Sequence, residues 1–487
     1  MIRLDGVRDR LKPAERFGLD TLVDLSRALV AEAAECELVR LIVVEEQGRG
    51  DLTADLAPAR LQRGDGAIHV STATLRAVAE VAGGAVEQRS SARDKNGRVP
   101  SSENPLVAAG RSREPLVSRL AMELRKAVLD VAGRRPVRFL TPWPRGFRWA
   151  AVVTHDLDVV EWWALFPLLR MLELGKKRAW SLTSRVARAA SRSIGHEPVS
   201  RAVHSVLQLE AHHSIQATWF IICADPTLRS LLAGDSTYRP DAASTREILS
   251  AITHAGHEIG LHGSFATGDD PDLMSAQRRR LSRLTDRPIL GVRQHFLRMR
   301  PGESHRTMIE AGLEYDATWG FADRNGFRLG VADVIPAWDS ARSVTLPLDL
   351  VPLVWMDRAL SKYAGVEEAQ RWVEDGLELA RECKAVEGAW VGLWHPNLTE
   401  ALGFPDAEPA FVTLLRKLAD DRPYFASARK IVEWRRFRRS VRAAHVSPGG
   451  EVTLTIRAGH PASIALEDEM GDTTQERVQL VGPVGAA

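Results

Sequence analysis

Two carboxylates and a histidine come directly after an apolar segment in the stretch Trp149-Ala-Ala-Val-Val-Thr-His-Asp-Leu-Asp158. Residues 150–153 predict a buried strand, so Asp156 and Asp158 lie at its carboxyl end, where barrel and other α/β enzymes keep their catalytic groups. The two aspartates are two residues apart and share one face of a continued strand. Neighbouring carboxylates repel each other, and a cation between them offsets that repulsion. Taken alone, Asp-x-Asp is more often an Asp-rich turn that caps the following helix.

Histidines follow short apolar segments at several further points of the chain. His262, His295 and His395 each lie at or just after the end of such a segment, as His155 does, and Arg293 precedes His295 by two residues. If these segments are parallel strands, their carboxyl ends meet at one rim and bring the side chains together. Any one of these histidines is more often structural than a ligand, but imidazole and carboxylate together are what Zn²⁺ prefers. Their repetition favours a metal-dependent hydrolase.

The chain of 487 residues predicts two or three domains, because a single core rarely grows so large. Residues 1–145 have mixed α/β character, and a connector rich in Pro and Gly at 139–146 marks the end of this unit. In residues 146–440 short apolar strands alternate with helices, which is typical of a mainly parallel sheet or a barrel. Residues 441–487 form a tail whose segment 451–457 alternates with period two and predicts a hairpin strand.

The N-terminal unit offers little chemistry. Its pattern predicts amphipathic helices over 22–35 and 118–131 and a strand over 38–44. No catalytic residue types gather within it, so its role is unreadable from the pattern.

The composition is that of an ordinary globular protein, with 45% hydrophobic and 26% charged residues. A net charge of +2 does not indicate a nucleic-acid partner. No apolar run approaches the roughly 20 residues that span a bilayer, and the N-terminus lacks the apolar region of a signal peptide. The cysteines form neither a CxxC motif nor a disulfide framework, so we expect a cytoplasmic location. They are Cys36, Cys223 and Cys383.

Two segments are strongly basic. Arginines and lysines recur between Arg170 and Arg192, and again in residues 434–442. The second segment carries Trp434 and Phe437 three residues apart, beside a basic face. A helix on a membrane surface has this pattern, but a solvated helix whose stripe packs on its own domain fits better. Peripheral membrane contact through the basic segments is kept as the second interpretation.

Four motifs between about residues 148 and 440 resemble those of the polysaccharide deacetylase (NodB-homology, carbohydrate esterase 4-like) family, and they come in that family's order. The stretch 315–330 resembles a Gly-Phe-Arg-x-Gly subgroup, and the N-terminal unit resembles an uncharacterised domain that often precedes it. The resemblance implies a distorted (β/α) barrel of metal-dependent amide hydrolases, with an N-terminal α/β domain and a short β-rich tail. The four motifs are Thr154-His-Asp-Leu-Asp158 in the Asp-x-Asp form, Gly256-His-Glu-Ile-Gly-Leu-His262, Gly291-Val-Arg293 and Leu393-Trp-His395.

One departure from the family concerns the metal ligands. The usual second motif is His-x-x-x-His, but the residue four positions after His262 is Ala266. By resemblance Asp158 and His262 bind a divalent ion, with Zn²⁺ expected. We take His295 as the replacement ligand because it lies at the rim of the next strand. His257 is the weaker alternative, and without any replacement the site would bind no metal.

The resemblance also implies the catalytic roles. Asp156 would act as the general base, Arg293 would pair with Asp156, and His395 would protonate the departing amine. His155 and Arg328 would hold the substrate or support the site, and two tryptophans would offer flat faces to a sugar ring. The tryptophans are Trp319 and Trp394.

The predicted function is removal of N-acetyl groups from a carbohydrate, and a cytoplasmic enzyme of this kind would act on a glycan precursor. The basic segments give a weak hint that this precursor carries anionic pyrophosphate. Two alternatives stay open. The missing second histidine fits a non-catalytic carbohydrate-binding or assembly protein on a degenerate barrel. The same residues also fit an amidohydrolase of a small non-sugar C–N substrate.

Overall fold

The structure is a computed structural model, and it places most of the 487 residues. The predicted helix over 22–35, the strand over 451–457 and Cys36 fall partly or wholly outside the described residues. No helix among those described is long and apolar enough to cross a membrane. The described residues are 1–4, 10–32, 34, 37–48, 50–52, 61–64, 66–133, 137–144, 146–161, 165–176, 178–193, 198–446, 452–456, 466–467 and 479–481.

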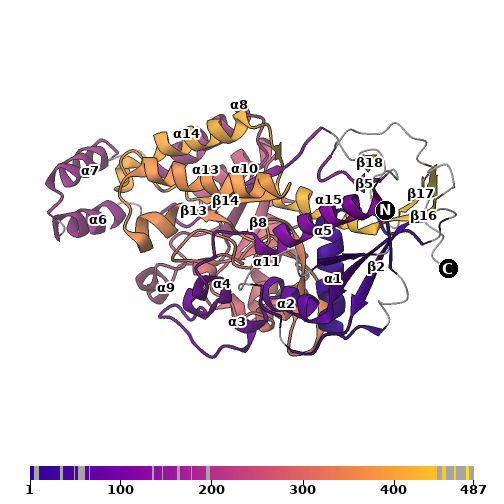
Figure 1. Ribbon diagram of the computed structural model, residues 1–487. Helices are drawn as coiled ribbons and strands as arrows, with labels where there is room; N and C mark the ends of the chain where they lie inside the picture. The colour runs from indigo at the N-terminus through magenta and orange to yellow at the C-terminus, as the bar shows by residue number, and fades with distance from the viewer. Residues whose placement is uncertain are drawn as a thin grey trace.

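A ten-stranded sheet forms the centre of the protein (Figure 1). Its strands run in the order β11-β12-β10-β9-β8-β7-β6-β14-β13, and β15 pairs with the start of β6. Every pair is parallel except β11 with β12. The strands are β6 (Ala150–Leu157), β7 (Thr218–Ile222), β8 (Glu258–Gly263), β9 (Gly291–Gln294), β10 (Tyr315–Asp316), β11 (Ile335–Asp339), β12 (Val344–Leu350), β13 (Trp355–Met356), β14 (Ala389–Trp394) and β15 (Tyr424–Phe425).

The central strands are apolar along their whole length because both faces of the sheet are covered. All residues of β6, β7 and β14 are buried, as expected for a parallel sheet between helices. The prediction of a mixed α/β fold with parallel strands is thereby confirmed. The closed barrel is not seen, because the hydrogen-bonded path through the described strands ends at β11 on one side and at β13 on the other.

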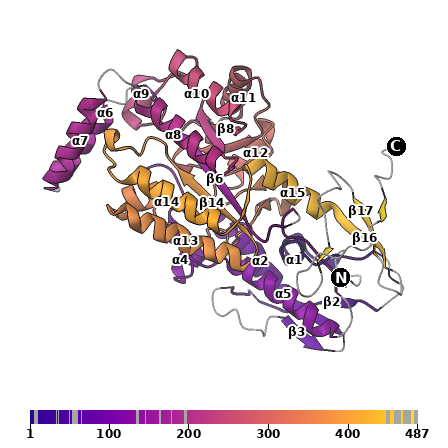
Figure 2. The same cartoon turned by 90° about the horizontal axis from the view of Figure 1, so that it is seen from above.

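Helices follow most of the strands and cover the sheet (Figures 1 and 2). Helix α10 ends two residues before Gly256, which adopts a φ of +79°. The helices are α6 (Leu165–Lys176), α7 (Trp180–Arg192), α8 (Pro198–His212), α9 (Leu228–Ala233), α10 (Ala243–His254), η4 (Thr267–Asp269), α11 (Pro271–Thr285), η5 (His295–Leu297), α12 (Glu303–Glu310), η6 (Ala359–Ala364), α13 (Ala369–Ala385), η7 (Glu400–Leu402), α14 (Ala407–Asp420) and α15 (Ala428–Ser440).

The N-terminal residues form a second, four-stranded sheet with the order β1-β2-β4-β3. The predicted strand over 38–44 is confirmed as β2. The predicted helix over 22–35 is wrong beyond residue 26, because Arg27 adopts a φ of +63° and ends α1 there. The elements are β1 (Ile2–Leu4), α1 (Pro13–Ser26), β2 (Val39–Val44), β3 (Leu61–Gly64), β4 (Ala67–Ser71), α2 (Thr72–Ala82), α3 (Ala85–Arg89), η3 (Ser101–Glu103), α4 (Pro105–Ala108) and α5 (Leu116–Ala132).

The N-terminal elements pack directly on the loops of the large sheet. Val117 N–H donates to the Gly330 carbonyl, and a Cβ on Gly326 would lie 2.3 Å from the Ser112 carbonyl oxygen. Short strands join this region to the C-terminal residues, where 452–456 form the predicted strand as β17. They are β5 (Phe139–Leu140), β16 (Val441–Val446), β17 (Val452–Ile456), β18 (Leu466–Glu467) and β19 (Gln479–Val481).

Candidate active site

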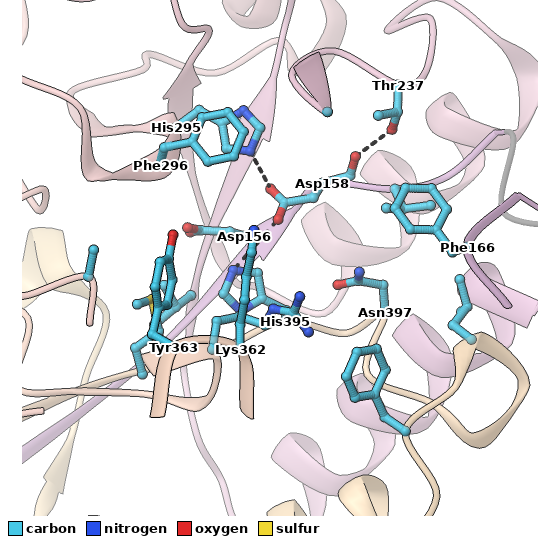
Figure 3. A pocket seen from close by; sticks show the side chains of 18 of the residues that line it. Asp156, Asp158, Phe166, Thr237, His295, Phe296, Lys362, Tyr363, His395 and Asn397 are labelled. Atoms are coloured by element: carbon cyan, nitrogen blue, oxygen red, sulfur yellow. Dashed lines mark hydrogen bonds and ion pairs between the residues drawn. The ribbon is translucent and has the colours of Figure 1, made fainter. Parts of the chain in front are cut away.

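A cavity of about 340 Å³ opens at the carboxyl ends of the central strands (Figure 3). The predicted catalytic and metal-binding side chains meet there because parallel strands present their carboxyl ends on the same edge. Asp156 and Asp158 come from β6 and the residue after it, His262 from β8, and His295 and His395 directly follow β9 and β14. The rim predicted from the sequence therefore exists as one site.

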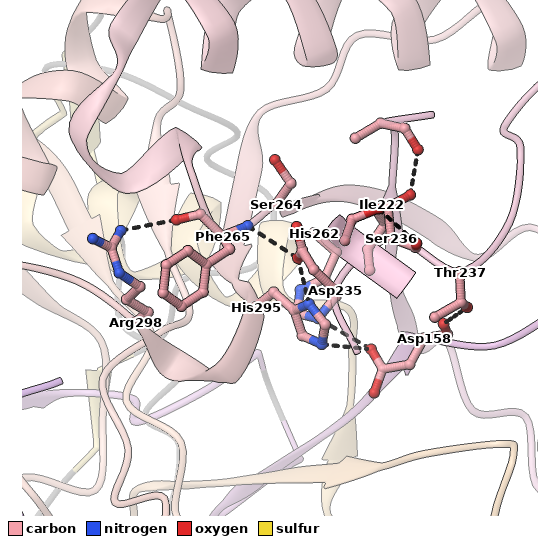
Figure 4. A network of polar contacts seen from close by, with 12 residues as sticks. Asp158, Ile222, Asp235, Ser236, Thr237, His262, Ser264, Phe265, His295 and Arg298 are labelled. Carbon is pink, nitrogen blue, oxygen red and sulfur yellow. Dashed lines mark hydrogen bonds and ion pairs between the residues drawn. The ribbon is translucent and has the colours of Figure 1, made fainter. Parts of the chain in front are cut away.

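Three of these residues form a compact group of possible metal ligands (Figure 4). One ligand atom from each of Asp158, His262 and His295 lies within 4.8 Å of the other two. Asp158 Oδ1 is 3.3 Å from His262 Nε2 and 3.6 Å from His295 Nε2. His295 thus occupies the place beside His262 that we expected it to take in the absence of a second motif histidine.

The second nitrogen of each imidazole is already engaged. His262 Nδ1 donates to the Arg293 carbonyl at 2.8 Å, and His295 Nδ1 lies 2.8 Å from Asp235 Oδ1. A histidine whose Nδ1–H is held in this way keeps the lone pair of Nε2 for a metal. Asp158 Oδ1 is buried and accepts no hydrogen bond from a described residue. This orphaned oxygen and the two oriented Nε2 atoms fit a divalent ion such as Zn²⁺.

The loops hold Asp158 and His295 firmly. Thr237 Oγ1 donates to the Asp158 carbonyl at 2.5 Å, and the ring of Phe296 stacks on His295 with centroids 4.0 Å apart. Phe296 and Leu297 both have positive φ angles, 58° and 54°, in the turn that brings His295 back over the site. Such strain is costly and is found where the surrounding structure fixes a functional group.

The electrostatics of this group suit a cation. Burial by itself would raise the pKa of Asp158, but His295 and the neighbouring histidines outweigh burial and hold that pKa well below its usual range. Burial opposes the charged form of His262, yet the carboxylates of Asp156 and Asp158 raise its pKa above the ordinary value. The carboxylate of Asp158 is therefore ionised at neutral pH and available as a ligand.

Asp156, which lines the cavity, is paired with the fully buried Arg293. Arg293 Nη1 donates to Asp156 Oδ1 at 2.9 Å and to Thr154 Oγ1 at 2.9 Å. Its guanidinium is fully buried and lies 4.5 Å from the centre of the Phe220 ring. Gly260 makes room for that ring, because a Cβ there would lie 2.6 Å from Phe220 Cε1. One oxygen of Asp156 is thus fixed and the other faces His262 Nε2 at 3.6 Å.

His395, which directly follows β14 beside β6, forms a second oriented pair in the cavity. Its Nδ1 lies 2.6 Å from Asp357 Oδ1, and its backbone N–H donates to Asp357 Oδ2 at 2.7 Å. Burial lowers the pKa of His395, but the buried carboxylate of Asp357 outweighs burial and raises it. His395 Nε2 faces the cavity, 3.6 Å from Asp158 Oδ2.

Four residues expected to hold the substrate or, for His155 and Arg328, to support the site do not line the cavity. His155 has no exposed surface, and its ring nitrogens face Glu210 Oε1 at 2.7 Å and the Trp394 carbonyl at 2.9 Å. The ring of Trp394 stacks on Phe411 with centroids 4.5 Å apart. His155 therefore anchors the end of β14, one residue before His395.

Trp319 and Arg328 lie instead at the contact with the N-terminal unit. Trp319 is fully buried and donates from Nε1 to His305 Nε2 at 2.9 Å. Arg328 pairs with the buried Glu87 of α3, with Nε 3.0 Å from Oε2. A pattern of apolar and polar residues does not reveal such burial by another part of the chain.

His257, the weaker alternative ligand, lies at the opposite end of β8 from His262. Its Nδ1 accepts from Ala217 N–H at 3.0 Å, and its Nε2 lies 3.5 Å from Glu210 Oε2. It lines no part of the cavity.

Several functional candidates were not found from the sequence. Asp235 and Asp357 orient His295 and His395, but only Asp357 gave a signal, as a carboxylate after the apolar segment 353–356. The remaining cavity wall comes from loops and from η6. Its cationic and aromatic residues include Arg98, Phe166, Arg170, Phe296, Arg358, Lys362, Tyr363 and Phe404.

No model of a protein family matches the chain, and no curated protein matches its sequence. Comparison with solved structures finds a presumed polysaccharide deacetylase from Mycobacterium smegmatis, which is 19% identical. That match covers 60% of this chain and 92% of the other, with a TM-score of 0.40.

Two further structures are the peptidoglycan deacetylase PdaC from Bacillus subtilis and a pseudoenzyme of carbohydrate esterase family 4 from Bacillus anthracis. Each is 10% identical with a TM-score of 0.30. The match to PdaC covers 59% of this chain and 92% of PdaC. The match to the pseudoenzyme covers 58% of this chain and 65% of the pseudoenzyme. Their TM-scores lie below 0.5, so the function of this chain has to be judged from its own cavity.

Proposed function

We propose that this protein is a metal-dependent hydrolase that removes an N-acetyl group from a carbohydrate or glycan precursor. One observation carries the proposal: three pre-oriented groups face the same cavity. They are the ligand cluster Asp158–His262–His295, the Asp156–Arg293 pair and the Asp357–His395 pair.

Asp158, His262 and His295 would hold the ion, with Zn²⁺ the best match to one carboxylate and two imidazoles. When bound, the ion supplies a Lewis acid for the amide carbonyl and lowers the pKa of a water molecule. Asp235 and the Arg293 carbonyl keep both imidazoles in the tautomer that this role requires.

Asp156 is suited to act as the general base. Arg293 fixes Oδ1 and favours the ionised carboxylate, which leaves Oδ2 to take a proton from the attacking water. Addition of that water to the carbonyl carbon gives a tetrahedral intermediate. A base held on one side by a buried guanidinium needs little reorganisation when the proton moves.

His395 is suited to act as the general acid. Asp357 accepts the Nδ1–H and stabilises the imidazolium, so the proton on Nε2 points into the cavity. Transfer of this proton to the amide nitrogen allows the C–N bond to break, and the products are acetate and a free amine. The acid and the base both adjoin the ligand cluster, because His395 Nε2 lies 3.6 Å from Asp158 Oδ2 and Asp156 Oδ2 lies 3.6 Å from His262 Nε2.

The cavity wall supports an anionic substrate. Arg358 is half-buried with its guanidinium 5.0 Å from the Phe404 ring, and Lys362 is exposed four residues later on the same helical turn. Neither makes an ion pair with a described residue. A sugar precursor that carries phosphate or pyrophosphate would satisfy both charges.

The test is release of acetate from a panel of N-acetylated sugars, sugar nucleotides and small amides by the zinc-loaded protein. We expect turnover of N-acetylated sugars that carry phosphate. Turnover of small amides alone would make the protein a different amidohydrolase. Tight metal binding without any turnover would favour the non-catalytic carbohydrate-binding protein.

A further inference from the structure

Helices α6 and α7 form a hairpin at the edge of the molecule. Both views show it apart from the helices that cover the sheet, at the opposite end from β16 and β17 (Figures 1 and 2). Two ion pairs tie its basic side chains to the loops of the large sheet. Arg170 pairs with Glu367 at 2.7 Å, and Arg185 pairs with Asp406 at 3.0 Å.

The hairpin exposes large apolar side chains. Leu168, Leu169, Leu172 and Trp180 are each more than half exposed to solvent. Leu172 follows Leu168 by four residues and Leu169 by three, so the three leucines form one apolar stripe on α6. Such a stripe normally packs on a core, whereas here it faces outward. Clustered exposed apolar residues mark an interaction surface, unlike single ones.

Basic residues surround the stripe. Residues 165–193 contain seven arginines and lysines and one acidic residue, Glu173. Exposed cations are found near the turn of the hairpin and along α7, and they make no ion pair with another described residue. They are Lys176, Arg178, Arg188 and Arg192.

We propose that the α6–α7 hairpin docks on an anionic lipid bilayer. Leucines and a tryptophan enter the boundary between headgroups and acyl chains, and neighbouring arginines and lysines bind lipid phosphates. The alternative occupant is a second copy of this chain. That contact would bring the four exposed cations without an ion pair on one copy against the same four on the other, and such like-charge juxtaposition is costly. The charge of the hairpin therefore selects the anionic bilayer.

Docking would place the cavity at the membrane surface. Phe166, Leu169 and Arg170 of α6 line the cavity as well as belonging to the hairpin. A lipid-linked sugar phosphate could then present its N-acetyl group to Asp156 and His395 while its lipid stays in the bilayer. This consequence rests on the proposed function, whereas membrane docking itself does not.

The experiment is co-sedimentation of the full chain with vesicles of phosphatidylcholine alone, or of phosphatidylcholine and phosphatidylglycerol in equal parts. We expect binding to the anionic vesicles, weak binding to the neutral ones, and loss of binding as salt screens the charges. Absence of binding to anionic vesicles at low salt would overturn the proposal. The assay needs no substrate, so its failure and a failure of the proposed hydrolase activity are separate results.

Variants locate the docking surface. Replacing Leu168, Leu172 and Trp180 together by Ser should lower the vesicle partition constant about tenfold or more. The matched control is Val44→Ser, an exposed apolar residue of the N-terminal sheet, which should bind as the unchanged protein does. Equal binding by the triple variant and the unchanged protein would assign the contact to another basic surface.

A second pair of substitutions keeps the test decisive if the triple variant folds poorly. Arg188→Glu and Arg192→Glu change exposed residues of α7, and each should weaken anionic vesicle binding about fivefold or more. Sedimentation equilibrium of the unchanged protein tests the alternative occupant, a second copy of this chain. A dimer that the leucine and tryptophan substitutions convert to a monomer would show that a second copy covers the hairpin.

Discussion

The rim of the cavity and the α6–α7 hairpin are neighbours, but their side chains are held in opposite ways. At the rim most polar side chains are held by assigned partners, as in the Asp357–His395 pair, and the buried oxygens without a hydrogen-bond partner among the described lining residues belong to Asp158 and Asn397. On the hairpin Leu168, Leu172 and Trp180 face solvent, and four exposed cations make no ion pair with a described residue. Tight positioning is what catalysis requires, and unmatched exposed groups are what docking requires. Substitutions should therefore affect chemistry at the rim and binding alone at the hairpin.

The largest effect should come from the carboxylates of β6. Asp156→Asn should lower turnover at least about a thousandfold and leave zinc binding intact, since it removes the base and no ligand. Asp158→Ala should abolish both turnover and zinc binding. Metal content by elemental analysis, measured beside acetate release, separates the two roles. Full zinc content in the Asp158 variant would contradict its assignment as a ligand.

His395 and its partner should come next. His395→Ala should lower turnover by about 10²–10⁴-fold with zinc retained, because it removes the proton donor. Asp357→Asn should lower kcat by about 10–100-fold and leave KM nearly unchanged, because Asp357 positions His395 without touching substrate. Loss of zinc in the His395 variant would instead make His395 a ligand.

The contact between the N-terminal unit and the large sheet should affect stability. Arg328→Met leaves the buried carboxylate of Glu87 without its partner and should lower the free energy of unfolding by about 3–5 kcal/mol. Urea denaturation measures this. The double variant Arg328→Met/Glu87→Leu should recover part of the loss, and equal destabilisation in both would show that shape, not charge, matters there.

Substitutions of the exposed leucines of the hairpin should have the smallest effect on the protein in the absence of membranes. Leu168→Ser and Leu172→Ser remove exposed side chains, so each should change the free energy of unfolding by less than about 0.5 kcal/mol. Acetate release from a water-soluble substrate should also stay unchanged. A clear loss of stability would mean that the stripe packs on the protein itself, and the contrast between rim and hairpin would fail.

The sequence predicted the rim better than its surroundings. Strand periodicity and the position of polar residues after each strand were enough to bring Asp156, Asp158, His262, His295 and His395 together. Burial by a distant segment leaves no local pattern, which explains why the sequence did not reveal that Trp319 and Arg328 lie at the contact with the N-terminal unit. The orienting residue Asp235 lies in a loop, where periodicity carries no information.

Boundaries were also harder to predict than elements. The helix predicted over 22–35 stops at residue 26 because Arg27 turns into the left-handed region, and no Gly or Pro announces that stop. The closed barrel came from the family resemblance, and the open hydrogen-bonded path of the described strands does not show it. The division of the chain at residues 145 and 440 stays a prediction.

The central claim is that His295 replaces the missing second histidine as a metal ligand. The most direct measurement is zinc titration by calorimetry of the unchanged protein, His295→Ala and His257→Ala, with unfolding curves to confirm that each is folded. Removal of His295 should weaken zinc binding at least about a hundredfold, because one of three protein ligands is lost. The His257 variant should bind zinc as the unchanged protein does. Unaltered affinity in the His295 variant, or its loss in the His257 variant, would contradict this assignment.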